Sequence, residues 1–149
     1  MKKKLILCCC IASFFLGCSP SGEKVVVPEV VKTKFASLYP NAANPEWEME
    51  DSTYEASYKQ DNIESSVTFS ADGNVIQSET EIDVAQLPQP VLDYLTAQFG
   101  NQKIKEAEKI TDSKGIVAFE VEIGETDYLF DSNGQFIGKE EEEDAKEKE

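Results

Sequence analysis

Residues 69–76 read Phe-Ser-Ala-Asp-Gly-Asn-Val-Ile, with a short β-forming run on each side of Asp72-Gly73. An Asp-Gly pair suits a tight turn with positive φ, so this stretch predicts a β-hairpin. The pattern returns at residues 130–137, Phe-Asp-Ser-Asn-Gly-Gln-Phe-Ile, where Asn133-Gly134 takes the turn positions. Two hairpins with the same pattern indicate a duplicated module.

The duplication extends upstream of each hairpin. Val31 and Phe35 precede the first hairpin at helical spacing, and they correspond to Val91 and Leu95 before the second. A proline or a glycine ends each of these segments, as expected for a helix stop. The repeat unit is therefore predicted to run from a helix through several strands to a closing hairpin.

The segments between helix and hairpin alternate between polar and apolar residues. In residues 46–50, Trp47 and Met49 alternate with three glutamates, and residues 116–123 alternate in the same way. A period of two predicts an antiparallel sheet with one dry face. The apolar helix stripe needs such a face. The predicted fold class is α+β, with two tandem helix-plus-antiparallel-meander repeats and the helices packed on one face of the sheet.

The N-terminus has the form of a targeting segment. Three lysines precede an apolar run at residues 5–16, which is short for a membrane span and suits a signal peptide. The run ends in Leu16-Gly17-Cys18, which resembles a bacterial lipoprotein signal, although Phe15 stands where leucine is usual. We expect lipidation of Cys18 and attachment to a membrane through lipid chains. The alternatives are an ordinary secretory signal and a buried helix.

The sequence divides into five segments by these criteria. We assign a lipoprotein signal peptide to 1–17, a tether to 18–27, a first repeat to 28–83, a second repeat to 84–138 and a solvated acidic tail to 139–149. The expected location is the cell envelope, with the anchored protein facing the periplasm or the cell surface.

Composition weighs against several classes of function. The formal net charge is −15, which makes nucleic acid a poor partner because phosphate contacts dominate that binding. The chain has no histidine or arginine, and all four cysteines lie at or before Cys18. The commonest acid–base and nucleophilic sets are therefore missing from the folded part. We expect neither an enzyme nor a cofactor.

The second hairpin carries oxygen-bearing side chains of the kind that bind a hard cation. Asp127, Asp131 and Asn133 lie close together, as oxygen ligands would. Their spacing departs from that of an EF-hand, and Asn-Gly is what a hairpin turn requires in any case. We therefore predict turn chemistry here and no metal site.

Glutamates that alternate opposite the apolar side chains are the best candidates for a binding surface. These are Glu46, Glu48, Glu50, Glu55, Glu120 and Glu122. If the two repeats abut, they form one acidic platform that would attract a basic envelope protein. The alternatives are a solvated face that keeps the protein soluble, and a cation-binding or scaffold lipoprotein whose sheet and tail concentrate cations.

The order of these features resembles the PepSY-like family of secreted or lipid-anchored bacterial proteins, whose repeat is similar to that of the beta-lactamase inhibitory protein. The residues that carry the resemblance are Phe35, Tyr39-Pro40-Asn41-Ala42, Trp47, Tyr58, residues 69–76, Phe99-Gly100, Phe119 and residues 130–137. The resemblance covers about residues 28–138, but Ala107 stands where the second repeat would carry tryptophan. It implies a sheet with one face open for non-covalent binding, such as inhibition of an envelope enzyme, and it brings no catalytic residues.

Overall fold

The computed structural model describes residues 25–50 and 52–141. The predicted signal peptide, Cys18 and residues 142–149 of the predicted tail lie outside these described residues. The elements, in chain order, are α1 (Glu29–Leu38), β1 (Ala43–Glu50), β2 (Thr53–Gln60), β3 (Ile63–Ser70), β4 (Val75–Glu81), the 3-10 turn η1 (Val84–Gln86), α2 (Gln89–Phe99), β5 (Glu106–Asp112), β6 (Val117–Ile123), β7 (Thr126–Asp131) and β8 (Phe136–Glu141). No described helix is long and apolar enough to cross a bilayer.

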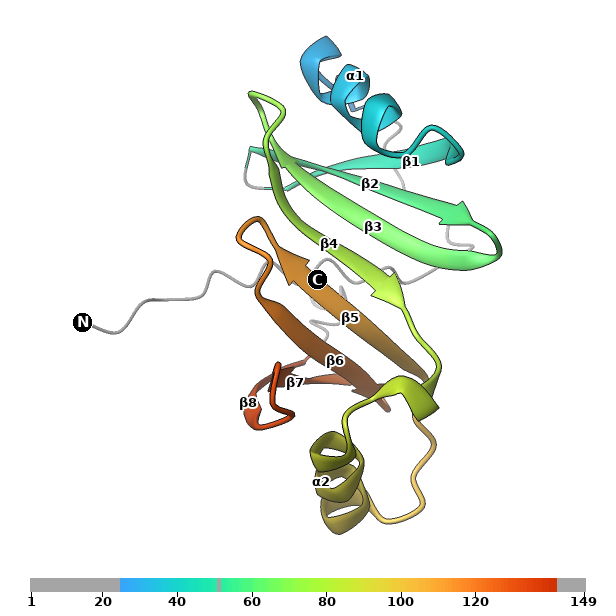
Figure 1. Cartoon of the computed structure of the whole chain (residues 1–149), viewed down its shortest axis with the longest axis vertical. Helices are drawn as coiled ribbons and strands as arrows, with labels where there is room; N and C mark the ends of the chain where they lie inside the picture. The colour runs from blue at the N-terminus through green and yellow to red at the C-terminus, as the bar shows by residue number, and fades with distance from the viewer. Residues whose placement is uncertain (1–24, 51, 142–149) are drawn as a thin grey trace, which may run out of the picture.

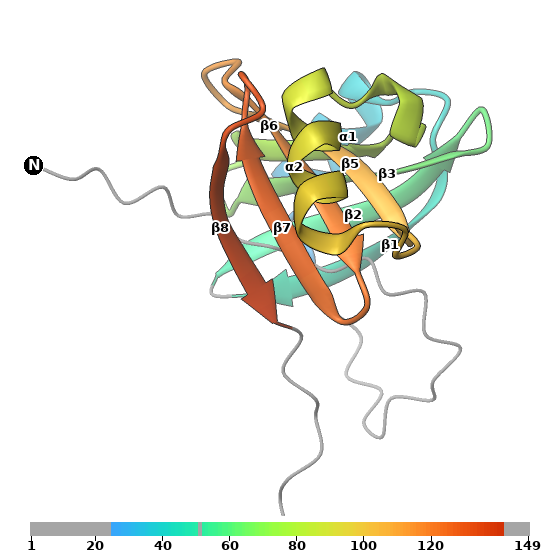
Figure 2. The ribbon, with the colours of Figure 1, turned by 90° about the horizontal axis from the view of Figure 1, so that it is seen from below.

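The eight strands form one antiparallel sheet in which sequence order is also spatial order. Each repeat supplies one helix and four strands, with α1 beside β1–β4 and α2 beside β5–β8 (Figure 1). The two halves are joined by pairing of β4 with β5, from Gln77 opposite Asp112 to Glu81 opposite Glu108. The sheet is strongly twisted (Figure 2). The predicted α+β class and the two repeats are thus present, and the repeats share one continuous sheet.

Each helix joins its repeat's strands through a small apolar cluster. In the first repeat, the buried side chains Val31 and Phe35 of α1 cluster with Ala56, Val67 and Phe69. Aromatic rings surround this cluster, and the ring of Phe35 meets that of Trp47 edge-on at 5.4 Å between centroids. Such pairs add to the gain from burial alone.

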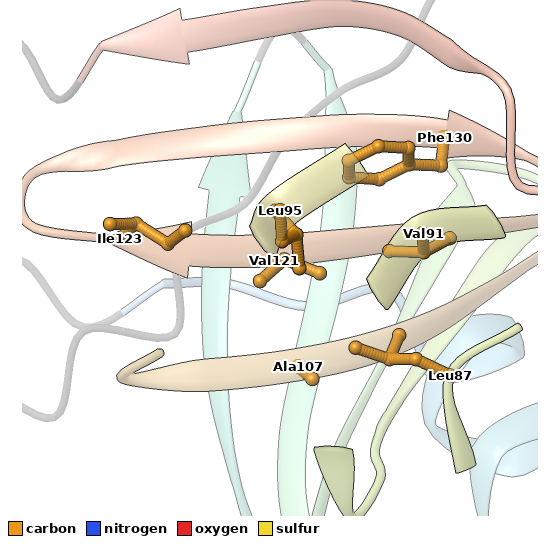
Figure 3. Close-up of a cluster of buried hydrophobic side chains, with 7 residues drawn as sticks. All are labelled: Leu87, Val91, Leu95, Ala107, Val121, Ile123 and Phe130. Atoms are coloured by element: carbon orange, nitrogen blue, oxygen red, sulfur yellow. The ribbon is translucent and has the colours of Figure 1, made fainter. Parts of the chain in front are cut away.

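The second repeat builds the equivalent cluster with smaller residues. Val91 and Leu95 of α2 meet Val121 and Phe130 of the sheet (Figure 3), with Ala107 also buried among them. Ala107, opposite Val121, takes the position that Trp47, opposite Ala56, has in the first repeat. The strand residues of both clusters lie on the same side of the sheet by register, and we call that side the helix face.

The two repeat hairpins are wider than the predicted two-residue turns. Residues 71–74 connect β3 to β4, and the amide of Gly73 donates to the carbonyl of Ser70 at 2.9 Å. Gly73 has φ +83°, as expected, whereas Asp72 does not adopt positive φ. A register shift follows at Phe69, so the hairpin combines a longer loop with a bulge.

The second hairpin requires glycine for a further reason, which is the close approach of the α2 backbone. Gly134 has φ +77°, and a Cβ there would lie 3.0 Å from Cβ of Pro90 and 3.2 Å from the backbone nitrogen of Val91. The hairpin turn therefore presses against the first turn of α2. The helix start and the closing hairpin of a repeat are a single packed unit, which explains why they recur together.

Two details of the sequence prediction were wrong. Met49 shares the parity of Trp47 but is 59% exposed, because it lies near the end of the edge strand β1. The acidic tail was expected from residue 139, yet β8 continues to Glu141. Lys139 and Glu140 pair with Tyr128 and Asp127 of β7, and this ladder extends the strand into the charged run.

Candidate functional site

The face of the sheet opposite the helix face carries the candidate site, and we call it the carboxylate face. Trp47 and Ala56 are paired residues on the helix face, so the strand residues next to them point the other way. The same argument applies to β6 through Val121. All six glutamates named from the sequence lie on the carboxylate face: Glu46, Glu48, Glu50, Glu55, Glu120 and Glu122.

Their accessibility differs from strand to strand. The three glutamates of β1 are exposed, because β1 is an edge strand. Glu122 is half-buried, whereas Glu55 is 5% exposed and Glu120 is 8% exposed. Strands on both sides enclose these last two side chains. The face therefore has an accessible rim on β1 and an enclosed centre.

Carboxylates that alternation alone did not single out fill that centre. On β4 to β6, Glu81 lies directly opposite Glu108, and Glu108 lies directly opposite Glu120. Directly opposed side chains of this kind have Cβ atoms about 5 Å apart, and like charges at such positions are destabilising. Three neighbouring strands thus place carboxyl groups in one row.

A second row crosses β5 to β8. Glu106 is opposite Glu122, which is opposite Asp127, which is opposite Glu140. The side chain of Lys105 offsets part of the negative charge of this row, because its Nζ lies 2.7 Å from a carboxylate oxygen of Glu122. Asp127 is 4% exposed, so its charge lies away from solvent.

Glu79 is the most enclosed carboxyl group of the cluster, at 3% exposed. Its two oxygens accept hydrogen bonds from the amide of Gln77 at 2.8 Å and the hydroxyl of Ser66 at 3.3 Å. Burial first, and then the charges of Glu120 and Glu55, raise the pKa of Glu79 to about 8. The neutral acid is therefore the main form of Glu79 at neutral pH.

The neighbouring rows show the same effect. Burial, followed by the charge of Glu79, raises the pKa of Glu108 to about 9. Burial, followed by the charges of Glu81 and Glu122, raises the pKa of Glu106 to about 7. The carboxylate face holds protons that ordinary glutamates would have released.

The same architecture occurs in known proteins. The sequence model of a family described as beta-lactamase-inhibitor-like, PepSY-like matches residues 23–77 and again residues 65–138. The chain belongs to the PepSY-like family. The two matches correspond to the two repeats of the sheet, so the resemblance drawn from the hairpins is confirmed. A search of curated proteins found none that matches the chain.

Several solved structures share the fold of this PepSY-like protein. A protein from Bacteroides eggerthii described as periplasmic aligns with TM-score 0.71 and 18% identity, covering 78% of this chain and 90% of its own. A DUF2874 family protein from Bacteroides uniformis gives 0.69 and 20%, with the same coverage. A BLIP-like protein from Bacteroides fragilis gives 0.63 and 22%, covering 85% of this chain and 94% of its own. Likeness at these identities shows a shared fold.

The sequence of this PepSY-like protein did not single out Glu79, Glu106 and Glu108, and it marked Asp127 only as a candidate ligand at the second hairpin. Alternation within each strand could have assigned them to a face. It could not show that β4 pairs with β5, and that pairing brings Glu79 and Glu108 into one cluster.

Among the candidate oxygen ligands at the second hairpin, Asp131 stabilises the turn. One carboxylate oxygen of Asp131 accepts hydrogen bonds from the backbone amides of Asn133 and Gln135, both at 2.9 Å. These bonds hold the pKa of Asp131 below its usual range. Among the residues that the structure describes, no group of three or more His, Cys, Asp or Glu side chains is placed to hold a metal ion.

Proposed function

We propose that this protein is a cell-envelope lipoprotein that binds a basic protein partner non-covalently through its carboxylate face. The observation that carries the proposal is the row of opposed carboxyl groups Glu81, Glu108 and Glu120 on neighbouring strands. Full ionisation of this row would cost folding free energy, and Glu108, with a pKa of about 9, keeps its proton at neutral pH. A partner that brought lysine or arginine side chains to the face would favour the ionised row and gain binding free energy from it.

The exposed glutamates of β1 suit the first step of such binding. A field of one sign attracts an oppositely charged partner and raises the association rate more than the affinity. Glu46, Glu48 and Glu50 are exposed on an edge strand, where a partner could reach them first. The enclosed carboxyl groups behind them would then determine which basic side chains fit.

The location rests on the N-terminal segment and on the similar structures. The apolar run followed by Gly17-Cys18 supports export and lipidation. The similar protein of Bacteroides eggerthii is described as periplasmic, in agreement with an envelope location. If Cys18 is the anchor, Cys18→Ser will abolish incorporation of a labelled fatty acid into the protein in the cell of origin.

Inhibition of an envelope enzyme is the form of binding that we favour. Its support is the likeness to a BLIP-like protein and the inhibitor-like description of the family. Both are likenesses of fold, so the choice of target must come from the face itself. The carboxylate face favours an enzyme with lysine or arginine side chains around its active site.

The test is affinity capture from envelope extract at low and high salt. We compare the protein with Glu46→Gln/Glu48→Gln/Glu50→Gln and with a control, Glu29→Gln/Asp93→Asn/Glu125→Gln, whose three carboxylates are exposed outside the carboxylate face. Both variants lose three negative charges. We expect one partner that is retained by the protein and the control at low salt, lost at high salt, and lost from the β1 variant.

Equal retention by both variants would refute the carboxylate face as the binding surface. If the β1 variant instead loses uptake of Ca²⁺ in equilibrium dialysis without any loss of partner, the cation-binding function is the correct one.

A further inference from the structure

A pocket opens at the beginning of β1, beside the carboxylate face. Its volume is about 210 Å³. The strand register shifts between Ala43 and Glu46, and Asn44 within this bulge has φ +50°. The bulge leaves Asn44 and Pro45 outside the β1–β2 pairs, between the pair of Ala43 with Lys59 and the pair of Glu46 with Ser57, and the pocket lies at this irregularity.

Three carboxyl groups line the pocket, and they come from both repeats. Glu46 of β1 and Glu64 of β3 contribute from the first repeat, and Glu108 of β5 contributes from the second. The lining also includes Lys59, whose Nζ lies 2.7 Å from a carboxylate oxygen of Glu64. With that ion pair formed, Glu46 and Glu108 still face the pocket.

The remaining walls can hold an aliphatic chain. Ala43 and Tyr58 line the pocket together with Ser57 and Ser65. The ring of Tyr58 packs on the helix face, 4.9 Å from the ring of Tyr39 and 5.3 Å from that of Phe35, so Ala43 is the apolar side chain of the lining on the side of Glu46. Long basic side chains pack their methylene stems on such surfaces while the charged head reaches polar groups.

We propose that this pocket receives one lysine or arginine side chain of the protein partner, with the stem against Ala43 and the cationic head between Glu46 and Glu108. This inference rests on the proposed function and names the subsite that would recognise one basic side chain of the partner. A cation there forms charge-assisted hydrogen bonds with carboxylates in a partly enclosed site, where such bonds are strong.

Binding at this subsite releases a proton. Burial and the charges of Glu79 (β4), Glu106 (β5), Glu120 (β6) and Asp127 (β7) raise the pKa of Glu108 to about 9. A cation beside Glu108 favours the carboxylate and lowers that pKa. The ionised form of Glu108 binds the cation. The affinity for the cation therefore rises with pH, by up to about tenfold per pH unit, until the pH passes the pKa of Glu108 in the unbound protein. The β1–β3 groups that also face the pocket are Glu46, Lys59 and Glu64.

The test uses the purified protein and needs no partner. Nα-acetyl-lysine methylamide and Nα-acetyl-arginine methylamide are titrated into labelled protein, with Nα-acetyl-norleucine methylamide as the uncharged probe, and amide resonances are followed. We expect a cationic probe to shift the amides of Ala43, Asn44, Glu46 and residues 57–59, and to bind more tightly at about pH 9 than at about pH 7. Norleucine should give no saturable shift.

Three variants make the test specific. Glu108→Gln should weaken binding of the cationic probe about tenfold at about pH 9, as expected for the loss of one charged hydrogen bond. Ala43→Leu should block the pocket without changing its charge. Glu125→Gln removes an exposed carboxylate outside the carboxylate face, and it should bind as the unaltered protein does.

Equal binding of lysine and norleucine probes would overturn the inference, as would unaltered binding by both Glu108→Gln and Ala43→Leu. So would binding that weakens as the pH rises. These outcomes concern the pocket alone. Salt-sensitive capture that depends on Glu46, Glu48 and Glu50 would still support the proposed function.

Discussion

Replacing Glu79 by glutamine should stabilise the protein, and the gain should grow with pH. The pKa of this carboxyl group is about 8 in the fold, against 4.5 for an ordinary glutamate. Below about pH 4.5 both the folded and the unfolded chain hold the proton, so ionisation costs folding nothing. Between the two values the unfolded chain releases the proton while the fold retains it, and stability falls as the pH rises.

The size of the effect follows from the two pKa values. Between these two pKa values, each unit of pH lowers the free energy of unfolding by about 1.4 kcal/mol. The cost to folding is therefore about 1 kcal/mol at pH 5, about 3 kcal/mol at pH 7, and between about 4 and 5 kcal/mol above pH 8. Glutamine carries no such cost. Glu79→Gln should raise the free energy of unfolding by these amounts at each pH.

The hydrogen bonds of Glu79 survive the exchange, which makes the comparison clean. The side-chain oxygen of glutamine can still accept from Gln77, now at 2.8 Å from Glu79. Its amide group can donate to the hydroxyl of Ser66, which at present donates to Glu79 at 3.3 Å. A hydroxyl serves as donor or acceptor, so Ser66 stays bonded.

The assay is urea unfolding followed by far-ultraviolet circular dichroism at a series of pH values. Glu125→Gln is the control, because Glu125 is exposed in the turn between β6 and β7 and its replacement should change stability by a few tenths of a kcal/mol at most. A gain for Glu79→Gln that is the same at pH 5 and pH 8 would refute the reasoning. So would destabilisation at pH 8.

Two further predictions concern the hairpins and the aromatic cluster. Gly134→Ala should lower the free energy of unfolding in urea by about 2 to 3 kcal/mol, because alanine there would combine positive φ with a Cβ 3.0 Å from that of Pro90. The control is Gly124→Ala, where φ is +72° and the space is open, and it should lower that free energy by about 1 kcal/mol. Equal losses would contradict the close approach. Phe35→Ala should shift the fluorescence of the single tryptophan, Trp47, to longer wavelength and cost about 3 to 5 kcal/mol; unchanged emission would show that the two rings do not pack.

Local patterns predicted the repeats because each repeat is built from short-range signals. Asp72-Gly73 and Asn133-Gly134 marked the hairpins, since positive φ at the turn strongly favours glycine. The apolar spacing of Val31 and Phe35 marked α1, and both side chains are buried in the first cluster. These signals depend on neighbours within a few residues, so they are readable in one sequence.

The enclosed centre of the carboxylate face could not be read in this way. Alternation assigns Glu79 and Glu108 to a face, but their pKa values depend on strand pairing over long range and on burial. The alternative of a solvated face does not hold for Glu55 and Glu120, which are buried between neighbouring strands. A carboxyl group on an inner strand is less exposed than the same residue on an edge.

The order of the strands also decides how the protein resists aggregation. Within the described residues, the eight-strand meander pairs β1 and β8 on one side only, and unpaired strand edges recruit other chains. The bulge and Pro45 interrupt β1, and its glutamates repel a second copy, while β8 carries Lys139 and Glu140 along a short strand. Neighbouring molecules would thus be kept from joining edge to edge, and the bulge at which the pocket opens also hinders fibre growth from the sheet.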